Sequence, residues 1–218
     1  MSNIWTSSYK AIQICNQYLA EFQGLTFDEL KLNDDYRAQM FRYTNSFKEA
    51  RFLRAYFYFN LVRAYGDVPY FTEMVTTDQV NSLTRTPAQE IFNAIIAECD
   101  KLSTELPADY TKLGLDGIAP AENGRVTCYA ALALKARAAL YAASPLFNPE
   151  NNKDLWRRAA EANKEVIETC TANGFKLSKY SELWGPNNWS NNEMIFVRRY
   201  NGNISTLEEY NFPMGVPG

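Results

Sequence analysis

The side chains best suited to ligand chemistry gather in one short turn, WGPNNW, near the end of the chain. Indole rings offer flat apolar faces on which sugar rings stack, and planar amides pair with sugar hydroxyls. The indoles of Trp184 and Trp189 flank the amides of Asn187 and Asn188, so this turn predicts a carbohydrate contact. The alternative is that both tryptophans plug the end of a helical stack, since large aromatic side chains are usually buried. Trp5 presents the same choice between capping a helix and binding a sugar.

Enzymatic and metal chemistry find little support. The chain has no histidine, which excludes Ser-His-Asp and Cys-His nucleophilic chemistry and histidine-ligated metal sites. The acidic run between residues 28 and 35 lacks the ligand spacing of a calcium loop. No carboxylate pair stands in a glycosidase motif, and no glycine-rich phosphate loop is present. We therefore predict no catalytic residue, no metal site and no cofactor.

Composition is that of an ordinary globular chain with many aromatic residues. Of its 218 residues, 46% are hydrophobic and 14% are aromatic. The net charge is -3 and the sequence has no basic stripe, which argues against a nucleic-acid partner. No stretch is long and apolar enough to span a bilayer. The four cysteines lie far apart in apolar helical surroundings, so we expect reduced thiols in the core; they are Cys15, Cys99, Cys128 and Cys170.

The element with the clearest pattern is a helix from Tyr36 to Tyr65, with a bend or break expected near residues 44–46. Consecutive aromatic residues cover most of its circumference, which is typical of a helix enclosed by other elements. Gly66 provides a left-handed cap and Pro69 blocks continuation, so the helix end is well defined. Residues 66–87 are then expected to form a loop.

Four further helices are predicted from apolar residues at three- and four-residue spacing. We expect the first two helices to pair, the next two to pair, and the last to pair with a short helix near Ser178–Leu183. The predicted ranges are Ile4–Phe22, Thr86–Leu106, Arg125–Ala143 and Asp154–Thr171. A short strand is expected at Met194–Tyr200. These features predict an all-α fold, an irregular tetratricopeptide-like α-α superhelix with a small β-hairpin element, occupying residues 1–218 as a single region.

Four segments, in the same order, resemble the SusD/RagB family of surface lipoproteins. The central one is EARFLRAYFYFNLVRAYGDVPYFTE, residues 49–73. The others are IWTSSYKAIQICNQYLAE, GRVTCYAALALKARAALYAASPLFN and ELWGPNNWSNNEMIFVRRYN, at residues 4–21, 124–148 and 182–201. The resemblance therefore covers nearly the whole chain.

The resemblance implies a non-catalytic protein of the outer-membrane surface. Such a protein captures oligosaccharide and delivers it to a SusC-like TonB-dependent transporter, on which it sits as a lid. Family members are anchored by a lipid on an N-terminal cysteine, and nothing at the start of this chain matches that signal. We therefore expect a piece of a longer protein that lacks the anchor and a C-terminal portion.

The ligand residues of the family are not held in a fixed motif, so none can be transferred by position. The expected ligand-binding residues rest on side-chain chemistry alone: Trp5, Trp184, Asn187, Asn188 and Trp189. A second class of function stays open, a helical-repeat scaffold or peptide-binding module, which would not need the aromatic turn. Some family members serve peptide uptake, so the cargo can be peptide rather than glycan.

Overall fold

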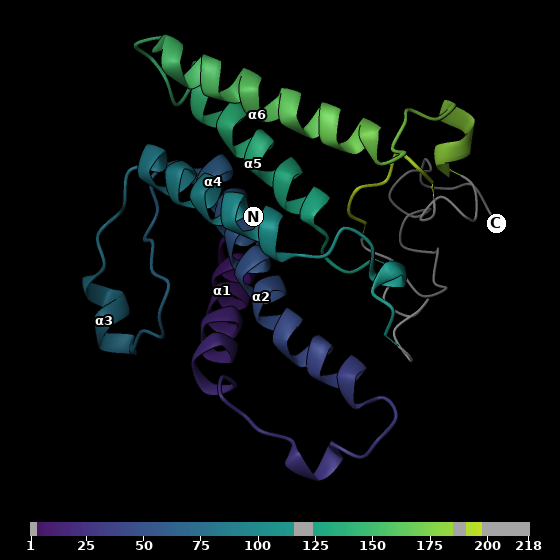
Figure 1. Ribbon diagram of the computed structural model, residues 1–218. Coiled ribbons are helices and arrows are strands. Elements are labelled where there is room, and N and C mark those ends of the chain that lie inside the picture. Colours follow the sequence, from purple (N-terminus) through teal and green to yellow (C-terminus); the bar gives the residue numbers. More distant parts are fainter. Residues whose placement is uncertain (1–3, 116–123, 185–190, 198–218) are drawn as a thin grey trace, which may run out of the picture.

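The computed structural model describes residues 4–115, 124–184 and 191–197, which fold as layered helices (Figure 1). The helices are α1 Ile4–Glu21, α2 Tyr36–Tyr65, α3 Thr77–Ser82, α4 Ala88–Glu105, α5 Cys128–Ala143 and α6 Lys153–Ala172. Short 3-10 turns lie at Asp28–Leu30, Tyr110–Lys112 and Tyr180–Trp184. None of the helices in these ranges combines the length and the hydrophobicity that crossing a bilayer requires.

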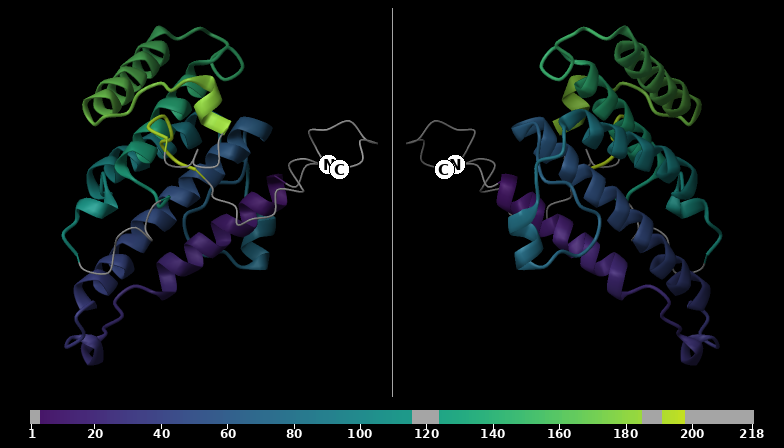
Figure 2. Two further views of the ribbon diagram at one scale, coloured as in Figure 1. Left: turned by 90° about the vertical axis from the view of Figure 1, so that its right-hand side faces the viewer. Right: turned by 90° about the vertical axis from the view of Figure 1, so that its left-hand side faces the viewer.

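The helices pack in a continuous array that confirms the all-α expectation. α1 packs on α2, α2 on α4, α4 on α5 and α5 on α6, and Figure 2 shows these layers from two sides. The expected pairs α1/α2 and α4/α5 are thus present. The partner of α6 is α5 rather than the segment near Ser178–Leu183, which forms only a 3-10 turn. α2 is one helix throughout, without a break at residues 44–46.

The core lies where α2, α4 and α5 meet. α2 contributes fully buried aromatic side chains such as Phe52 and Phe59, and α4 contributes a stripe that includes Ile91 and Leu102. The facing surface of α5 is mostly alanine, with Ala138 completely buried. Because alanine side chains are short, α4 and α6 can both approach the α5 backbone closely. The alanine-rich sequence therefore explains why α5 occupies the middle of three layers.

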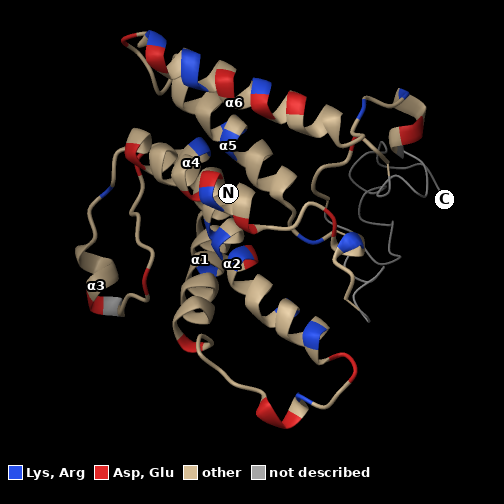
Figure 3. Cartoon of the chain, viewed as in Figure 1, with Lys and Arg blue, Asp and Glu red and all other residues tan. Residues whose placement is uncertain are grey.

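α6 has a solvent-exposed outer face. Charged side chains of both signs follow one another along it (Figure 3). Two of its ion pairs join residues three or four apart, Arg157 with Asp154 and Lys164 with Glu168. Such spacing places the partners on the same side of a helix. Only the opposite face, with Ala159 and Ala162, is buried.

Three local expectations are corrected by the structure. Residues 66–87 contain a short helix, α3, which a capping box between Thr76 and Gln79 begins. α4 begins at Ala88 rather than at Thr86, with Pro87 in its cap position, and the N–H of Ala88 donates to the carboxylate of the distant Asp67 at 2.8 Å. No strand is formed by residues 194–197, and the remainder of the expected strand lies outside the described residues.

The cysteines are reduced, as the sequence predicts. Cys15, Cys99 and Cys170 are buried and Cys128 is half-buried. Burial raises the pKa of Cys99 to about 12, with the neighbouring Glu98 carboxylate adding to the effect. This thiol therefore stays protonated at neutral pH and behaves as a small apolar side chain.

Candidate functional site

Of the five residues expected from sequence to bind a ligand, one is fully placed by the structure. Trp5 stands in the first turn of α1, and its side chain is 37% exposed. Trp184 is the last residue of the 3-10 turn Tyr180–Trp184. Asn187, Asn188 and Trp189 lie outside the described residues. The structure therefore brings only Trp5 into a defined surface feature.

That feature is a cleft of about 480 Å³, here called the Trp5 cleft. Its walls come from α1, from the segment 66–76 that follows α2, and from α3 with the residue after it, and Figure 2 shows α3 flanking α1. Most of the lining is apolar: Trp5, Tyr9, Pro69, Phe71, Met74, Val75, Val80 and Leu83. The remaining lining residues are Thr6, Lys10, Gln13, Asn16 and Glu73.

Trp5 is held in place by two aromatic neighbours. Its ring centroid lies 5.0 Å from that of Tyr9 and 5.1 Å from that of Tyr65, with interplanar angles of 63° and 90°. Edge-to-face contacts of this kind are favourable for aromatic pairs. Trp5 is thus held by two ring contacts while part of its surface remains open to solvent.

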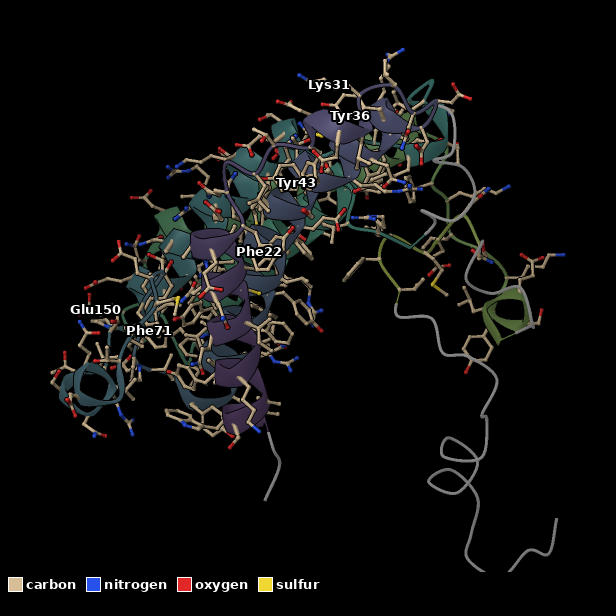
Figure 4. All side chains as sticks on the ribbon, turned by 90° about the horizontal axis from the view of Figure 1, so that it is seen from below. Phe22, Lys31, Tyr36, Tyr43, Phe71 and Glu150 are labelled. Atoms are coloured by element: carbon tan, nitrogen blue, oxygen red, sulfur yellow. The ribbon has the colours of Figure 1, made fainter. Side chains whose placement is uncertain are left out.

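The floor of the cleft is the contact between α1 and the segment 66–76. Tyr9 stacks on Phe71 at a centroid distance of 5.9 Å, and its hydroxyl donates to the Pro69 carbonyl at 2.8 Å. The side-chain amide of Asn16, two turns further along α1, donates to the Glu73 carbonyl at 2.9 Å. Figure 4 labels Phe71 beside α1. Residues seven apart share one helix face, so α1 presents both side chains to the same segment.

α2 fixes the same segment from behind. The Tyr58 hydroxyl donates to the Phe71 carbonyl at 2.6 Å and accepts from the Phe71 N–H at 2.9 Å. The Arg54 guanidinium donates to the Thr72 carbonyl at 2.7 Å and to the side-chain oxygen of Asn16 at 2.9 Å. The segment 66–76, which has no regular secondary structure, is thereby held at several successive backbone positions. The side of the cleft that this segment forms is therefore preorganised.

The tyrosine hydroxyls at the cleft and behind it are uncharged at neutral pH. Burial raises the pKa of Tyr9, only partly opposed by the positive charge of Arg85, and burial likewise raises the pKa of Tyr58. Both hydroxyls therefore remain protonated donors at neutral pH. No group of histidine, cysteine or carboxylate side chains in the described part of the chain could hold a metal ion. The arrangement offers a ligand aromatic stacking, apolar contact and polar side chains such as Lys10 and Gln13.

A second, open cleft of about 650 Å³ is lined by residues within 107–113, 124–129, 173–175 and 191–197. Tyr129, Phe175 and Phe196 contribute aromatic surface, and Asn173 and Asn191 contribute amides. Part of its lining comes from residues 191–197.

One wall of the second cleft is fixed by an ion pair between distant parts of the chain. Arg125 donates twice to Glu49 of α2, at 2.8 and 2.9 Å. The Tyr110 hydroxyl lies 2.9 Å from the same carboxylate and accepts from the amide of Asn45 at 2.8 Å. This network ties the connection between α4 and α5 to α2.

The sequence interpretation missed Tyr9 and Phe71 as lining residues of a site. Both belong to apolar helical or turn patterns that are typical of core. The spacing of Trp5 and Tyr9, four residues apart on α1, was the one available signal, since such a pair shares a helix face.

The chain is similar to proteins of one known family. Residues 1–140 match the SusD-like family whose description is "Starch-binding associating with outer membrane". A SusD-like protein of Formosa agariphila, P2, is 26% identical over 210 residues, which is 94% of this chain and 35% of that protein. The chain spans only about a third of the curated relatives that it matches, 31% of one and 35% of the other.

Solved structures share the fold. A SusD-like carbohydrate binding protein from Bacteroides fragilis superposes with a TM-score of 0.66 at 28% identity, covering 88% of this chain and 32% of that one. A laminarin binding SusD-like protein superposes with a TM-score of 0.64 at 25% identity, covering 89% of this chain and 36% of that one.

Proposed function

The chain belongs to the SusD-like family, and from this premise we propose that it is a non-catalytic glycan-binding component of an outer-membrane nutrient uptake system. The observation that carries the proposal is the family match over residues 1–140, with a description that names starch binding. Similar structures with carbohydrate-binding and laminarin-binding titles support it. Neither cleft presents a general acid paired with a base or nucleophile, which agrees with binding rather than hydrolysis.

The proposed partners are an oligosaccharide and a SusC-like TonB-dependent transporter. In this proposal the longer protein is a lipid-anchored surface lipoprotein of the outer membrane, and it delivers its ligand to the transporter. Residues 1–218 act as its helical-repeat region. The rigid array of α1, α2, α4, α5 and α6 would provide the frame on which binding loops are presented.

The proposed glycan contacts in this chain are Trp5 in its cleft and, from the WGPNNW turn, Trp184, Asn187, Asn188 and Trp189. The support for Trp5 is geometric, because its ring is fixed by Tyr9 and Tyr65 yet remains 37% exposed. A fixed aromatic surface loses little conformational entropy when a sugar ring stacks on it. The support for the other four residues is the chemistry of indole and amide side chains.

Affinity electrophoresis in gels that contain starch or laminarin tests the proposal. We expect the wild-type chain to migrate more slowly with polysaccharide than without it, and Trp5→Ala to weaken binding roughly tenfold through loss of one stacking surface. Trp156→Ala is the matched control, because Trp156 on α6 is 38% exposed and lies away from both clefts. Unchanged migration of the wild-type chain across a broad polysaccharide panel would count against glycan binding by these residues.

A peptide is the competing ligand. A helical-repeat module that binds peptides would keep the same fold without slowing in any polysaccharide gel. Recovery of a defined oligopeptide by the wild-type chain, lost in Trp5→Ala and kept in Trp156→Ala, would favour that alternative.

A further inference from the structure

The polar groups on the floor of the Trp5 cleft are already hydrogen-bonded to the protein. The Tyr9 hydroxyl already donates its proton to the Pro69 carbonyl. The amide nitrogen of Asn16 donates to Glu73, and its oxygen accepts from Arg54. Proline itself has no N–H to offer. Asn16 is 2% exposed, so the acceptor capacity of the Tyr9 hydroxyl is the main hydrogen-bonding capacity that these groups leave for a ligand. A sugar hydroxyl against the apolar surface beside it would lose water partners without replacement, which is unfavourable.

The wall opposite α1 is aliphatic. Met74 and Val75 end the segment 66–76, and Val80 and Leu83 belong to α3 and the residue after it. Met74 is 50% exposed and Val80 is 47% exposed, so apolar surface here is open to solvent. Such a wall suits an alkyl group better than a hydroxyl.

Polar groups with free capacity lie instead along the exposed face of α1. Lys10 and Gln13 line the cleft, are exposed, and have no recorded hydrogen bond or ion pair within the described residues. A lysine ammonium offers three donors, and a glutamine amide offers both donors and an acceptor. The cleft therefore has an aliphatic patch formed by Met74, Val75, Val80 and Leu83, while the polar side chains Lys10 and Gln13 lie on α1 and the Glu73 carboxylate lies next to Met74 in the chain.

We infer that the Trp5 cleft binds a sugar residue bearing an alkyl substituent, such as a 6-deoxyhexose, with its methyl group against Met74 and Val80. The ring stacks on Trp5, and the ring hydroxyls face Lys10 and Gln13. This inference rests on the proposed glycan-binding function and adds to it the class of sugar.

A matched pair of probes isolates the methyl group. Methyl β-D-quinovoside is the 6-deoxy form of methyl β-D-glucoside, so the two differ by one hydroxyl. We expect the quinovoside to bind roughly tenfold more tightly, the order that a buried hydroxyl without a partner produces. Titrations are followed by NMR on chain 1–218, through the indole N–H of Trp5 and the methyl signals of Val75, Val80 and Leu83.

Two variants locate the effect. Val80→Thr keeps the side-chain shape while replacing one methyl by a hydroxyl, and it should bring the quinovoside-to-glucoside ratio toward one. Trp156→Ala should leave the ratio and the affinities unchanged. Heteronuclear spectra of each variant establish that the fold is kept.

Equal affinities of the two glycosides in the wild-type chain would overturn the inference while leaving glycan binding intact. Absence of shifts at the cleft signals with either glycoside would also overturn it, and the longer starch and laminarin oligosaccharides then report separately on glycan binding elsewhere in the chain. If those oligosaccharides also shift no signal, the proposed function fails as well. Cleft shifts with an apolar peptide such as acetyl-Leu-Val-Leu-amide, and none with sugars, would make the cleft a peptide-docking site.

Discussion

Replacing Tyr58 by phenylalanine should destabilise the protein and loosen the wall of the Trp5 cleft. Tyr58 is 1% exposed, and its hydroxyl makes two hydrogen bonds to Phe71, one as donor and one as acceptor. Each bond contributes about 0.5–1.5 kcal/mol net, so Tyr58→Phe should lower the free energy of unfolding by about 1–3 kcal/mol. The ring stays, so its packing against Tyr70 at 4.6 Å is retained.

Urea unfolding monitored by circular dichroism measures this loss as a lower midpoint with an unchanged slope. Hydrogen exchange should show faster exchange of the Phe71 N–H and its neighbours in the segment 66–76, with little change in α5. Tyr65→Phe is the control on the same helix, because Tyr65 is 40% exposed and its hydroxyl has no recorded bond within the described residues. A loss below about 0.5 kcal/mol for Tyr58→Phe, or an equal loss for Tyr65→Phe, would refute the assignment of the hydroxyl as an anchor of this wall.

Three further outcomes follow from other parts of the array. Lys135→Met removes the ammonium that forms ion pairs with Asp100 of α4 and Glu165 of α6. The free energy of unfolding in urea should fall by about 0.5–1 kcal/mol. The control Lys164→Met, on the outer face of α6, should change it by about zero. Ala138→Leu should cost about 1–3 kcal/mol by overpacking the α5 face, read as a lower thermal midpoint; an unchanged midpoint would contradict close packing there. Burial raises the pKa of Tyr9, Tyr58 and Tyr110 above the ordinary tyrosine value of about 10. Their stabilising contribution is therefore present below about pH 10 and is lost as pH rises toward the folded-state pKa, so the urea midpoint should fall from about pH 9 to about pH 11. A constant midpoint would contradict the raised pKa of these tyrosines.

The helices could be predicted from the sequence because the signals that form them are local. The apolar spacing of residues 36–65 and the sequence Gly66 to Pro69 determine where α2 ends, and Gly66 indeed has a φ of +70°. The same holds for the alanine-rich α5, whose small side chains predict close approach of its neighbours. The α3 helix was missed although its capping box is a local signal, since six residues give too little periodicity to recognise.

The clefts could not be predicted in this way. Trp5, Phe71 and Val80 line one cleft although they come from three different elements, and more than sixty residues separate the first from the last. Only the packing of α1 on α2 brings them together. The carbohydrate contact expected at the Trp184–Trp189 turn from its indole and amide side chains remains a prediction.

What the sequence determined by itself is therefore the helical class, the position of most helix ends and the exclusion of histidine chemistry. These depend on spacing of a few residues or on composition. Tertiary structure alone decided which polar groups are already paired. The Asp67 carboxylate accepts from the first N–H of α4, and Arg125 pairs with Glu49, 76 residues away. The nitrogen and the oxygen of the Asn16 amide each have a partner. A hydrogen bond forms between groups that the fold brings within about 3 Å, whatever their separation along the chain. For that reason the binding capacity of each cleft is a property of the packed helices.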